Sequence, residues 1–412
     1  MDLEIVTVGT ELLLGFTVDT NSAFAGKELA ALGVKVVRRT AVADTPEDIR
    51  SAVADALART GAVLTTGGLG PTRDDISKVE VAKLFDAPLE FRPAIWEGII
   101  ERFKRFGRVP GDNNRIQAEM PRGAIELKNR WGSAPGIWLE GPPGLVIMLP
   151  GVPREMRNLL THEVLPRLAA RGGATVVRSR TLRTSGMGES ALAERMGEIE
   201  SEIAPLTLAY LPDLGAVDLR VTAWDLPADE ADRRLEAAAA IIRSRAGRHL
   251  FGEGTTDLAE VVLEASRQRG LTLATAESCT GGLIGGRLTA IPGSSDVVIG
   301  GTIAYSDRVK EIALDVPVAT LKEHGAVSEP VVRAMAEGAA RRLGATLTVA
   351  VTGIAGPGGG SEAKPVGTVW FATHHRGETV SVQQILFGER DEIRARAAQV
   401  ALYLLWRRME EG

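Results

Sequence analysis

Three loops in the last third of the chain carry the residue types that nucleophilic catalysis needs. Ser278, with Cys279 beside it, follows a strand-like run and precedes a glycine pair and an apolar helix. Lys310 follows a second strand-like run, and a Gly-rich stretch at 352–360 follows a third. A serine hydroxyl becomes nucleophilic when a base takes its proton, and a desolvated lysine can be that base. The loops therefore predict a Ser–Lys hydrolytic site.

Each of these features also has a purely structural interpretation. Ser278 or Thr280 could cap a helix, Lys310 could be solvated, and the glycine stretch could be a flexible loop. Cys279 is the rival nucleophile, but a cysteine without a histidine partner is more often a small buried hydrophobe. Free amides at the helix start could hold an anion or an oxyanion, and Tyr305 could relay a proton to Lys310. Together, the three loops favour the hydrolytic interpretation.

A glycine loop followed by two acids lies in the first third of the chain. Gly67, Gly68 and Gly70 follow a buried strand run, and glycines there let the backbone approach phosphates closely. Asp74 and Asp75 come next. The pair could hold a hard cation such as Mg²⁺, or could simply complement a helix dipole.

Three further acids follow predicted strand ends, where ligands gather in parallel sheets. They are Glu11, Asp44 and Glu155. Asp44 is a candidate contact to ribose or base. The sequence predicts a divalent-metal site formed by Asp74, Asp75, Glu11 and Glu155.

Alternating strands and helices must position these groups. Strand runs at 3–8, 34–42 and 62–66 alternate with helical runs at 21–32 and 46–58, which predicts βαβ units and a parallel sheet. The same alternation returns near the C-terminus, and the stretch between reads β-α-β-β-α. We therefore expect an α/β protein in which two α/β domains flank a small α+β module, with boundaries at 1–171, 172–252 and 253–412.

Composition excludes several classes of protein. The 412 residues carry 48 basic and 53 acidic side chains, a net charge of −5, which disfavours a globally basic nucleic-acid binder. The single cysteine forbids an intrachain disulfide or a multi-cysteine zinc site. No 18-residue apolar run and no basic signal region are present, so we expect a cytoplasmic protein without a membrane partner.

Residues 276–282, 305–310 and 351–357 resemble the signature of the C-terminal domain of the CinA family (competence/damage-inducible protein A). The resemblance implies deamidation of nicotinamide mononucleotide to nicotinic acid mononucleotide and ammonia, without a cofactor. It assigns Ser278 as nucleophile and Lys310 as the proton-transfer group, with Tyr305 and Thr352 in the same site. The substrate contacts that it implies are Cys279, Thr280, Gly281, Gly353, Gly356 and Arg394.

Residues 1–170 resemble the molybdopterin-binding (MoaB/MogA-like) domain, with Leu69 in place of a threonine, as in the CinA branch. This resemblance implies a metal-dependent ADP-ribose pyrophosphatase that releases AMP and ribose 5-phosphate, with Gly67, Gly68, Gly70 and Asp44 near the substrate. The middle segment resembles a KH-like module without a basic Gly-x-x-Gly loop, so an organising or dimerising role is favoured.

The sequence thus predicts a bifunctional nucleotide-salvage hydrolase that binds small nucleotides and forms a homodimer. Two alternatives stay open. One gives the first domain a molybdopterin-binding or adenylyltransferase role. The other is a non-catalytic partner in competence or DNA uptake, which the acidic charge and the lack of aromatic-basic clusters disfavour.

Overall fold

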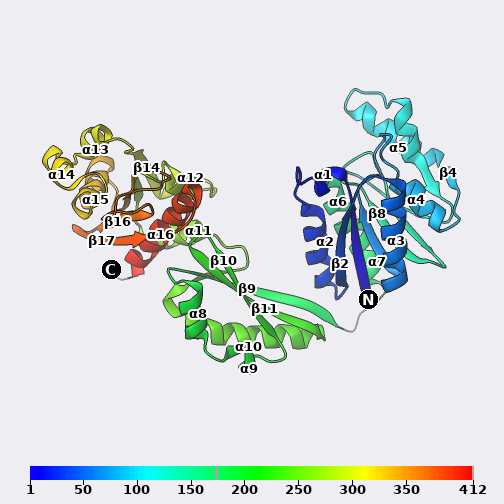
Figure 1. The fold of residues 1–412 in the computed structure, drawn as a ribbon, viewed down its shortest axis with the longest axis horizontal. Coiled ribbons are helices and arrows are strands. Elements are labelled where there is room, and N and C mark those ends of the chain that lie inside the picture. Colours follow the sequence, from blue (N-terminus) through cyan, green and yellow to red (C-terminus); the bar gives the residue numbers. More distant parts are fainter. Residues whose placement is uncertain (172–174, 411–412) are drawn as a thin grey trace. The chain divides into compact units, whose positions relative to one another are not determined.

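The computed structural model describes residues 1–171 and 175–410 (Figure 1). The predicted boundary at residues 171 and 172 falls beside 172–174, which lie outside the described residues, as do 411–412 of the predicted third domain. The chain divides into two compact units. One holds Met1–Arg178 and Ala223–Arg233, and the other holds Ser179–Thr222 and the chain from Arg234 onward.

The first domain has a six-stranded sheet in the order β2-β1-β3-β8-β7-β6 and a two-stranded sheet, β4-β5. Its strands are β1 (Asp2–Val8), β2 (Lys35–Val42), β3 (Ala62–Thr66), β4 (Leu89–Phe91), β5 (Glu119–Pro121), β6 (Ile125–Leu127), β7 (Gly136–Gly141) and β8 (Gly144–Leu149). Its helices are α1 (Thr10–Leu13), α2 (Thr20–Ala31), α3 (Pro46–Thr60), α4 (Ser77–Leu84), α5 (Pro93–Arg105), α6 (Pro153–Leu159) and α7 (Leu165–Ala169), with a 3-10 helix η1 (Asp112–Ala118) and a π-helical turn η2 (Leu160–Val164).

Alternating side chains of the central strands face two separate cores. On β1, Leu3 and Ile5 pack with α2, α6 and α7, whereas Val6 and Val8 pack with α3, α4 and α5. This three-layer arrangement needs strands that are apolar on both faces, and β1, β3 and β8 are such runs. The fold places the ends of β1, β3 and β8 at one edge, where the predicted first site lies.

The sheet differs from the predicted parallel one in its last strands. The pairings β1–β2, β1–β3 and β3–β8 are parallel, but β8–β7 and β7–β6 are antiparallel. The reason is local, because β7 and β8 are joined by the tight turn Gly141–Gly144, and antiparallel strands need only a short turn. Helix α3 is capped by Thr45, whose hydroxyl accepts a hydrogen bond from the Asp48 amide.

The middle module contains the predicted β-α-β-β-α elements, together with a second short helix, α9, and a fourth strand, β12, that the sequence did not predict. Its sheet runs β10-β11-β9-β12. Its elements are β9 (Val176–Ser185), α8 (Glu189–Met196), α9 (Ile199–Glu202), β10 (Thr207–Asp213), β11 (Ala216–Leu226), α10 (Ala228–Ala246), the 3-10 helix η3 (Gly247–His249) and β12 (Leu250–Glu253).

The last domain has a mixed five-stranded sheet, β14-β13-β15-β16-β17. Its strands are β13 (Leu273–Glu277), β14 (Val298–Ile303), β15 (Leu347–Gly353), β16 (Thr368–His375) and β17 (Glu378–Ile385). Its helices are α11 (Leu258–Arg269), α12 (Leu283–Thr289), α13 (Asp307–Leu314), α14 (Val318–His324), α15 (Glu329–Leu343) and α16 (Arg390–Glu410), with a 3-10 helix η4 (Ser294–Asp296).

Here too the helices cover both faces of the sheet. The helices α11, α12 and α16 pack on one face, and α13, α14 and α15 pack on the other. Strands β13, β14 and β15 are mutually parallel, so their carboxyl ends meet at one edge. Among the helices of the described residues, none is long and apolar enough to cross a lipid bilayer.

Candidate functional site

The predicted serine and lysine lie together in the last domain. Ser278 is the first residue after β13, and Lys310 lies in α13, which follows β14. The Lys310 Nζ is 3.2 Å from the Ser278 Oγ. Only 1% of Lys310 and 8% of Ser278 is exposed. The parallel pairing of β13 with β14 brings these two loops to the same sheet edge.

Main-chain carbonyl groups complete the surroundings of the lysine. Its Nζ donates to the carbonyl oxygens of Ala304, at 2.9 Å, and Tyr305, at 3.4 Å. The nearest carboxylate oxygen, on Asp307, is 3.9 Å away. Burial lowers the pKa of Lys310, against a smaller opposing effect of the Asp307 charge. The two carbonyl oxygens and the Ser278 hydroxyl are thus the three hydrogen-bond partners of the Lys310 Nζ.

The carboxylate of Glu277 shapes the loop that carries Ser278. It accepts hydrogen bonds from the amides of Gly282 at 2.9 Å, Ile284 at 3.1 Å and Gly285 at 2.8 Å. These three amides at the helix start are therefore not free for an oxyanion, because a buried side chain of the same chain occupies them. Sequence reasoning missed Glu277, although an acid that ends a buried strand before a glycine pair is a signal.

The rival nucleophile, Cys279, is a poor one in this structure. Its side chain belongs to the core of the domain. Burial raises the pKa of the Cys279 thiol to about 12, so the thiolate that would attack is scarce. The hydroxyl of its neighbour Thr280 is buried, and the described residues offer it no hydrogen-bond partner.

Two arginines at the start of α16 contact the same loops. Arg394 donates to the carbonyl oxygens of Cys279 and Thr280, both at 3.2 Å. Arg390, which sequence reasoning missed, donates to the Tyr305 hydroxyl at 3.1 Å and to the carbonyl of Gly356. Since Arg390 and Arg394 are four residues apart, they lie on one helix face, and this spacing was the available signal.

Tyr305 and Thr352 lie in the site region, but their hydroxyls bond elsewhere. The Tyr305 ring is 61% exposed, and its hydroxyl accepts from Arg390. The Thr352 hydroxyl is buried and donates to the carbonyl of Ala326 at 2.9 Å. These contacts give both residues a structural role in the sheet-edge loops.

Three glycines of the predicted substrate loops are explained by close packing. A Cβ on Gly353 would lie 2.9 Å from the carbonyl oxygen of Thr368, and one on Gly356, at φ +80°, would lie 2.7 Å from the Val366 side chain. At Gly281, φ is +61°, a conformation that a side chain strains. The Gly-rich loop is thus a packed connection as well as a possible anion contact.

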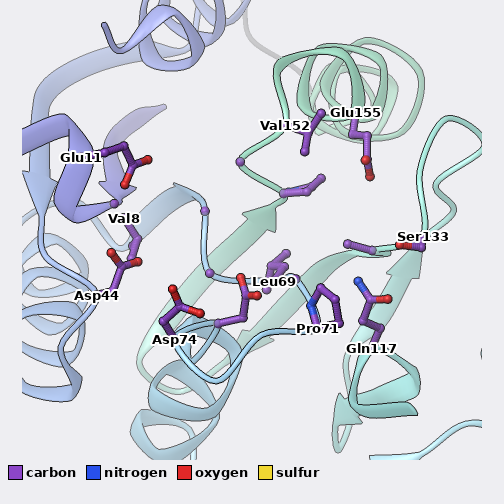
Figure 2. Close-up of a pocket in the computed structure, with 18 residues that line it drawn as sticks. Val8, Glu11, Asp44, Leu69, Pro71, Asp74, Gln117, Ser133, Val152 and Glu155 are labelled. Carbon is purple, nitrogen blue, oxygen red and sulfur yellow. The ribbon is translucent and has the colours of Figure 1, made fainter. Parts of the chain in front are cut away.

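In the first domain, a pocket of about 380 Å³ opens over the glycine loop (Figure 2). Its lining includes the glycine loop and every predicted acid of this domain: Gly67, Gly68, Gly70, Asp44, Asp74, Asp75, Glu11 and Glu155. The glycines are required by the fold, because a Cβ on Gly67 would lie 2.2 Å from the Val8 carbonyl oxygen and one on Gly68 would lie 2.1 Å from the Ser77 hydroxyl.

The acids of this pocket are held apart by separate partners. The Asp44 carboxylate accepts from the Thr10 amide at 2.8 Å, and the Asp75 carboxylate accepts from the Thr72 amide at 2.8 Å. Figure 2 shows Glu155 on the opposite side of the pocket from Glu11 and Asp44.

No three His, Cys, Asp or Glu side chains gather within metal-binding range anywhere in residues 1–171 and 175–410. The predicted four-carboxylate site of Asp74, Asp75, Glu11 and Glu155 is therefore not assembled, because the acids follow different strands across the width of the pocket. Hydrogen bonding from Thr72 lowers the pKa of Asp74, and burial raises that of Glu155.

Sequence reasoning missed three polar side chains at this pocket. Gln117 and Ser133 line it. Asn21 donates to the carbonyl of Gly151 at 2.7 Å, and so ties α2 to the loop after β8. Nothing in the spacing of Gln117 or Ser133 along the sequence indicated that they would line this pocket.

The glycine loop of the middle module packs against α16. A Cβ on Gly186 would lie 2.3 Å from the ring of Tyr403. The amide of Gln399 donates to the Ser185 hydroxyl at 3.2 Å, and the Tyr403 hydroxyl lies 3.2 Å from Nδ1 of the buried His249. The loop between β9 and α8 is thus packed against α16 of the last domain.

Three family models match successive parts of the chain. They are described as "Probable molybdopterin binding domain" for residues 4–170, "Damage-inducible protein CinA KH domain" for 179–252 and "CinA C-terminal domain" for 255–409. This order of domains confirms the predicted class, in which two α/β domains flank a KH-like module.

Relatives share this whole arrangement. A CinA-like protein of Gemmatimonas aurantiaca is 52% identical over 406 residues, which cover 98% of this chain and 95% of the relative. A putative competence-damage inducible protein of Symbiobacterium thermophilum is 43% identical over 419 residues, which cover 99% and 98%. The chain belongs to the CinA family. The crystal structure of competence/damage inducible protein CihA from Agrobacterium tumefaciens matches 36% of this chain and 91% of that chain, at 46% identity and a TM-score of 0.35.

Proposed function

We propose that the last domain deamidates nicotinamide mononucleotide and that the first domain hydrolyses ADP-ribose. The single observation that supports the first activity best is the buried Lys310 Nζ, 3.2 Å from the Ser278 Oγ. Burial lowers the pKa of Lys310 and so increases the share of the neutral amine, which is the form that can act as a base for a serine hydroxyl. The high pKa of the Cys279 thiol favours Ser278 as the nucleophile of this proposal.

The proposed reaction has two halves. In the first, the Ser278 oxygen attacks the amide carbon while its proton passes to Lys310. The carbon–nitrogen bond then breaks, and the Lys310 ammonium returns the proton to the leaving nitrogen, which departs as ammonia. In the second half, water attacks the ester and gives its proton to Lys310, which passes it back to the Ser278 oxygen. Lys310 thus ends each cycle as the neutral amine.

Arg390 and Arg394 support a substrate that carries a phosphate. A cation in the first turn of a helix is disfavoured by the helix dipole, and both arginines stand at the start of α16. Their guanidinium groups suit an anion such as a 5′-phosphate. The nucleotide would then lie between these arginines and Ser278.

The pocket over the glycine loop supports the second activity. Gly67 and Gly68 line this pocket, and because they have no side chain, the backbone there can approach a diphosphate closely. Mg²⁺ keeps several waters and typically needs only one or two carboxylates besides phosphate oxygens. In our proposal the cation therefore arrives bound to the substrate diphosphate, and Asp74, which lines the pocket beside the glycine loop, is the carboxylate that meets it.

The test is incubation of the full chain with each nucleotide, with and without Mg²⁺, followed by chromatography of the products. We expect ammonia release from nicotinamide mononucleotide that is independent of Mg²⁺, and AMP release from ADP-ribose that requires it. Absence of either product would contradict the corresponding half of the proposal.

A second candidate for the first domain is pterin handling, which the family description "Probable molybdopterin binding domain" favours. The same pocket would then bind a pterin phosphate. Release of AMP from ADP-ribose in a reaction that contains no pterin would argue against this candidate.

A further inference from the structure

A second cavity adjoins the pocket over the glycine loop. Its volume is about 460 Å³, within the usual range for small-ligand sites. It shares Ser133 and Glu155 with the first pocket, and Figure 2 shows these two residues on the side of the pocket away from Glu11 and Asp44. We call this cavity the Trp131 cleft. The lining residues that matter for its chemistry are Arg102, Phe103, Phe106, Arg108, Trp131 and Glu155.

The loop that carries Trp131 is held rigidly by one asparagine. The Asn129 side-chain oxygen accepts from the amides of Trp131, at 2.9 Å, and Gly132, at 2.8 Å. Its nitrogen donates to the Ala134 carbonyl at 2.7 Å and to the Glu155 carboxylate at 2.5 Å. A Cβ on Gly132 would lie only 1.6 Å from the Glu155 carboxylate, so only glycine allows the loop to pack this closely against Glu155. The cleft is thus preorganised.

The aromatic side chains of the cleft present ring faces at the surface. Trp131 stacks on His162 with ring centroids 5.1 Å apart and planes 17° apart, which fixes the orientation of the indole. Phe106 is 70% exposed, so its ring is accessible to a ligand. Rings that stack with bases, together with arginine, are typical of nucleobase recognition.

Charge around the cleft also favours a nucleotide. Arg102 and Arg108 line it, and Arg102 is anchored by donating to the Arg130 carbonyl at 2.9 Å. The Glu155 carboxylate also lines the cleft, and its oxygens can accept a hydrogen bond from the exocyclic amine of a base.

We propose that the Trp131 cleft binds the adenine base of the nucleotide whose diphosphate lies over the glycine loop. This inference rests on the proposed ADP-ribose activity and deepens it, because it assigns the two ends of the substrate. The base lies at Trp131 and Ser133, and the ribose phosphate lies toward Glu11 and Asp44. The recognised chemistry is a flat heteroaromatic ring, which a pterin shares with a purine.

The experiment uses the full chain and the variants Trp131→Ala, Trp131→Phe and Phe106→Ala. Trp224→Ala is the control, since Trp224 is a 49% exposed tryptophan on β11 of the middle module. Calorimetry measures the Kd of AMP and of neopterin, and competition assays measure inhibition by ribose 5-phosphate. Kinetics measure KM and kcat for ADP-ribose with Mg²⁺.

We expect Trp131→Ala to raise the Kd of AMP about tenfold or more, because the base loses one stacking partner. Trp131→Phe should keep most of the affinity, Phe106→Ala should lose part of it, and ribose 5-phosphate and the control should be unchanged. The KM for ADP-ribose should rise more than kcat falls.

Unchanged AMP binding in Trp131→Ala and Phe106→Ala would overturn the assignment. An equal loss of affinity for AMP and for ribose 5-phosphate would also overturn it. So would tighter binding of neopterin than of AMP, if neopterin binding depends on Trp131 in the same way. If AMP binding depends on Trp131 but ADP-ribose is not hydrolysed, the cleft stands and the proposed activity fails. If hydrolysis proceeds without dependence on Trp131, the activity stands and the cleft assignment fails.

Discussion

The two α/β domains bury one lysine each among the described residues, and only one of these lysines faces a nucleophile. Burial lowers the pKa of Lys78 in the first domain to about 8, partly offset by the charge of Glu119, and it also lowers the pKa of Lys310. Lys78 donates to the carbonyl of Ile116 and so holds η1 in place. Lys310 lies against the Ser278 hydroxyl. Burial lowers the pKa of a lysine, so that its amine can act as a base. The neighbouring residue then decides whether that base has a proton to accept.

The two sites differ in the same way. In the last domain, Ser278 contacts Lys310, and Glu277 holds the loop that follows Ser278, and the fold makes these buried contacts without a ligand. In the first domain the acids bond to local partners around an open pocket, as Asp44 and Asp75 do. In the proposed reactions, the last domain contributes a serine and a lysine that are already in contact. The first domain contributes an open pocket with separate acids, and the substrate and its cation must complete that site.

The largest effect should come from removing the nucleophile. Ser278→Ala should lower deamidation of nicotinamide mononucleotide by roughly 10⁴-fold or more, as loss of a catalytic serine does elsewhere. The hydrolysis of ADP-ribose by the same variant is the matched control and should be unchanged, because that site lies in another domain. Ammonia release and AMP release are measured on one preparation. Deamidation at the wild-type rate would remove Ser278 from the mechanism.

Replacing the two lysines tests the comparison directly. Lys310→Met should lower deamidation by roughly 10²–10⁴-fold, the usual contribution of a general base. Lys310→Arg should be as inactive, because arginine does not lose its proton. Lys78→Met, which changes the other buried lysine, should leave deamidation unaffected. Equal losses in the Lys310 and Lys78 variants would show that burial, and not contact with Ser278, matters.

The same lysine fixes the direction of the pH dependence. Deamidation needs the neutral amine, so kcat/KM should rise with pH through the lowered pKa of Lys310 and then level off. Between that pKa and the ordinary value of 10.5, the unfolded chain binds more protons than the folded one, so Lys310 contributes stability that increases with pH. Denaturation of wild type and Lys310→Met at several pH values should therefore show the wild type gaining relative stability toward pH 10.5.

Sequence reasoning reached the parts of each site that local pattern determines. Ser278 and Lys310 stand directly after strand-like runs, and parallel strand ends meet at one edge, so their proximity could be predicted. The Thr45 cap follows from the Thr-Pro-Glu-Asp run alone. The α/β class follows from the alternation of elements.

Other features depend on tertiary structure that no pattern specifies. The role of Glu277 appears only when the loop closes over its carboxylate. Asp74 and Glu155 follow neighbouring strands, so the sequence predicted that they would share a metal site. The loops after these strands instead keep the predicted carboxylates from gathering as a metal-binding group among the described residues. The antiparallel edge arises from the short turn before Gly144, which the strand count did not reveal.

A moderate effect is expected at Glu277. Glu277→Gln replaces one acceptor oxygen with an NH₂ group that faces an amide donor, so the Ser278 loop should loosen. Deamidation should fall about tenfold, and the free energy of unfolding should fall by roughly 1–3 kcal/mol, the cost of unsatisfied buried hydrogen-bonding groups. Steady-state kinetics and urea denaturation measure the two effects. A loss as large as that of Ser278→Ala, with unchanged stability, would instead make Glu277 a direct participant in the reaction.

The smallest effect should come from Thr352, which the family resemblance places in the catalytic set and whose hydroxyl the structure ties to Ala326. Thr352→Val keeps the shape and removes one buried hydrogen bond, so the free energy of unfolding should fall by about 1–2 kcal/mol. Deamidation measured below the melting range should stay within about threefold of wild type, because the hydroxyl contacts neither Ser278 nor Lys310 in the residues described. Thr352→Ser, which restores the donor, should recover part of the stability. A hundredfold loss of kcat in Thr352→Val with full rescue by Thr352→Ser would mean that the hydroxyl turns from Ala326 to the substrate, and that the last domain is less completely assembled before binding than its Ser–Lys contact indicates.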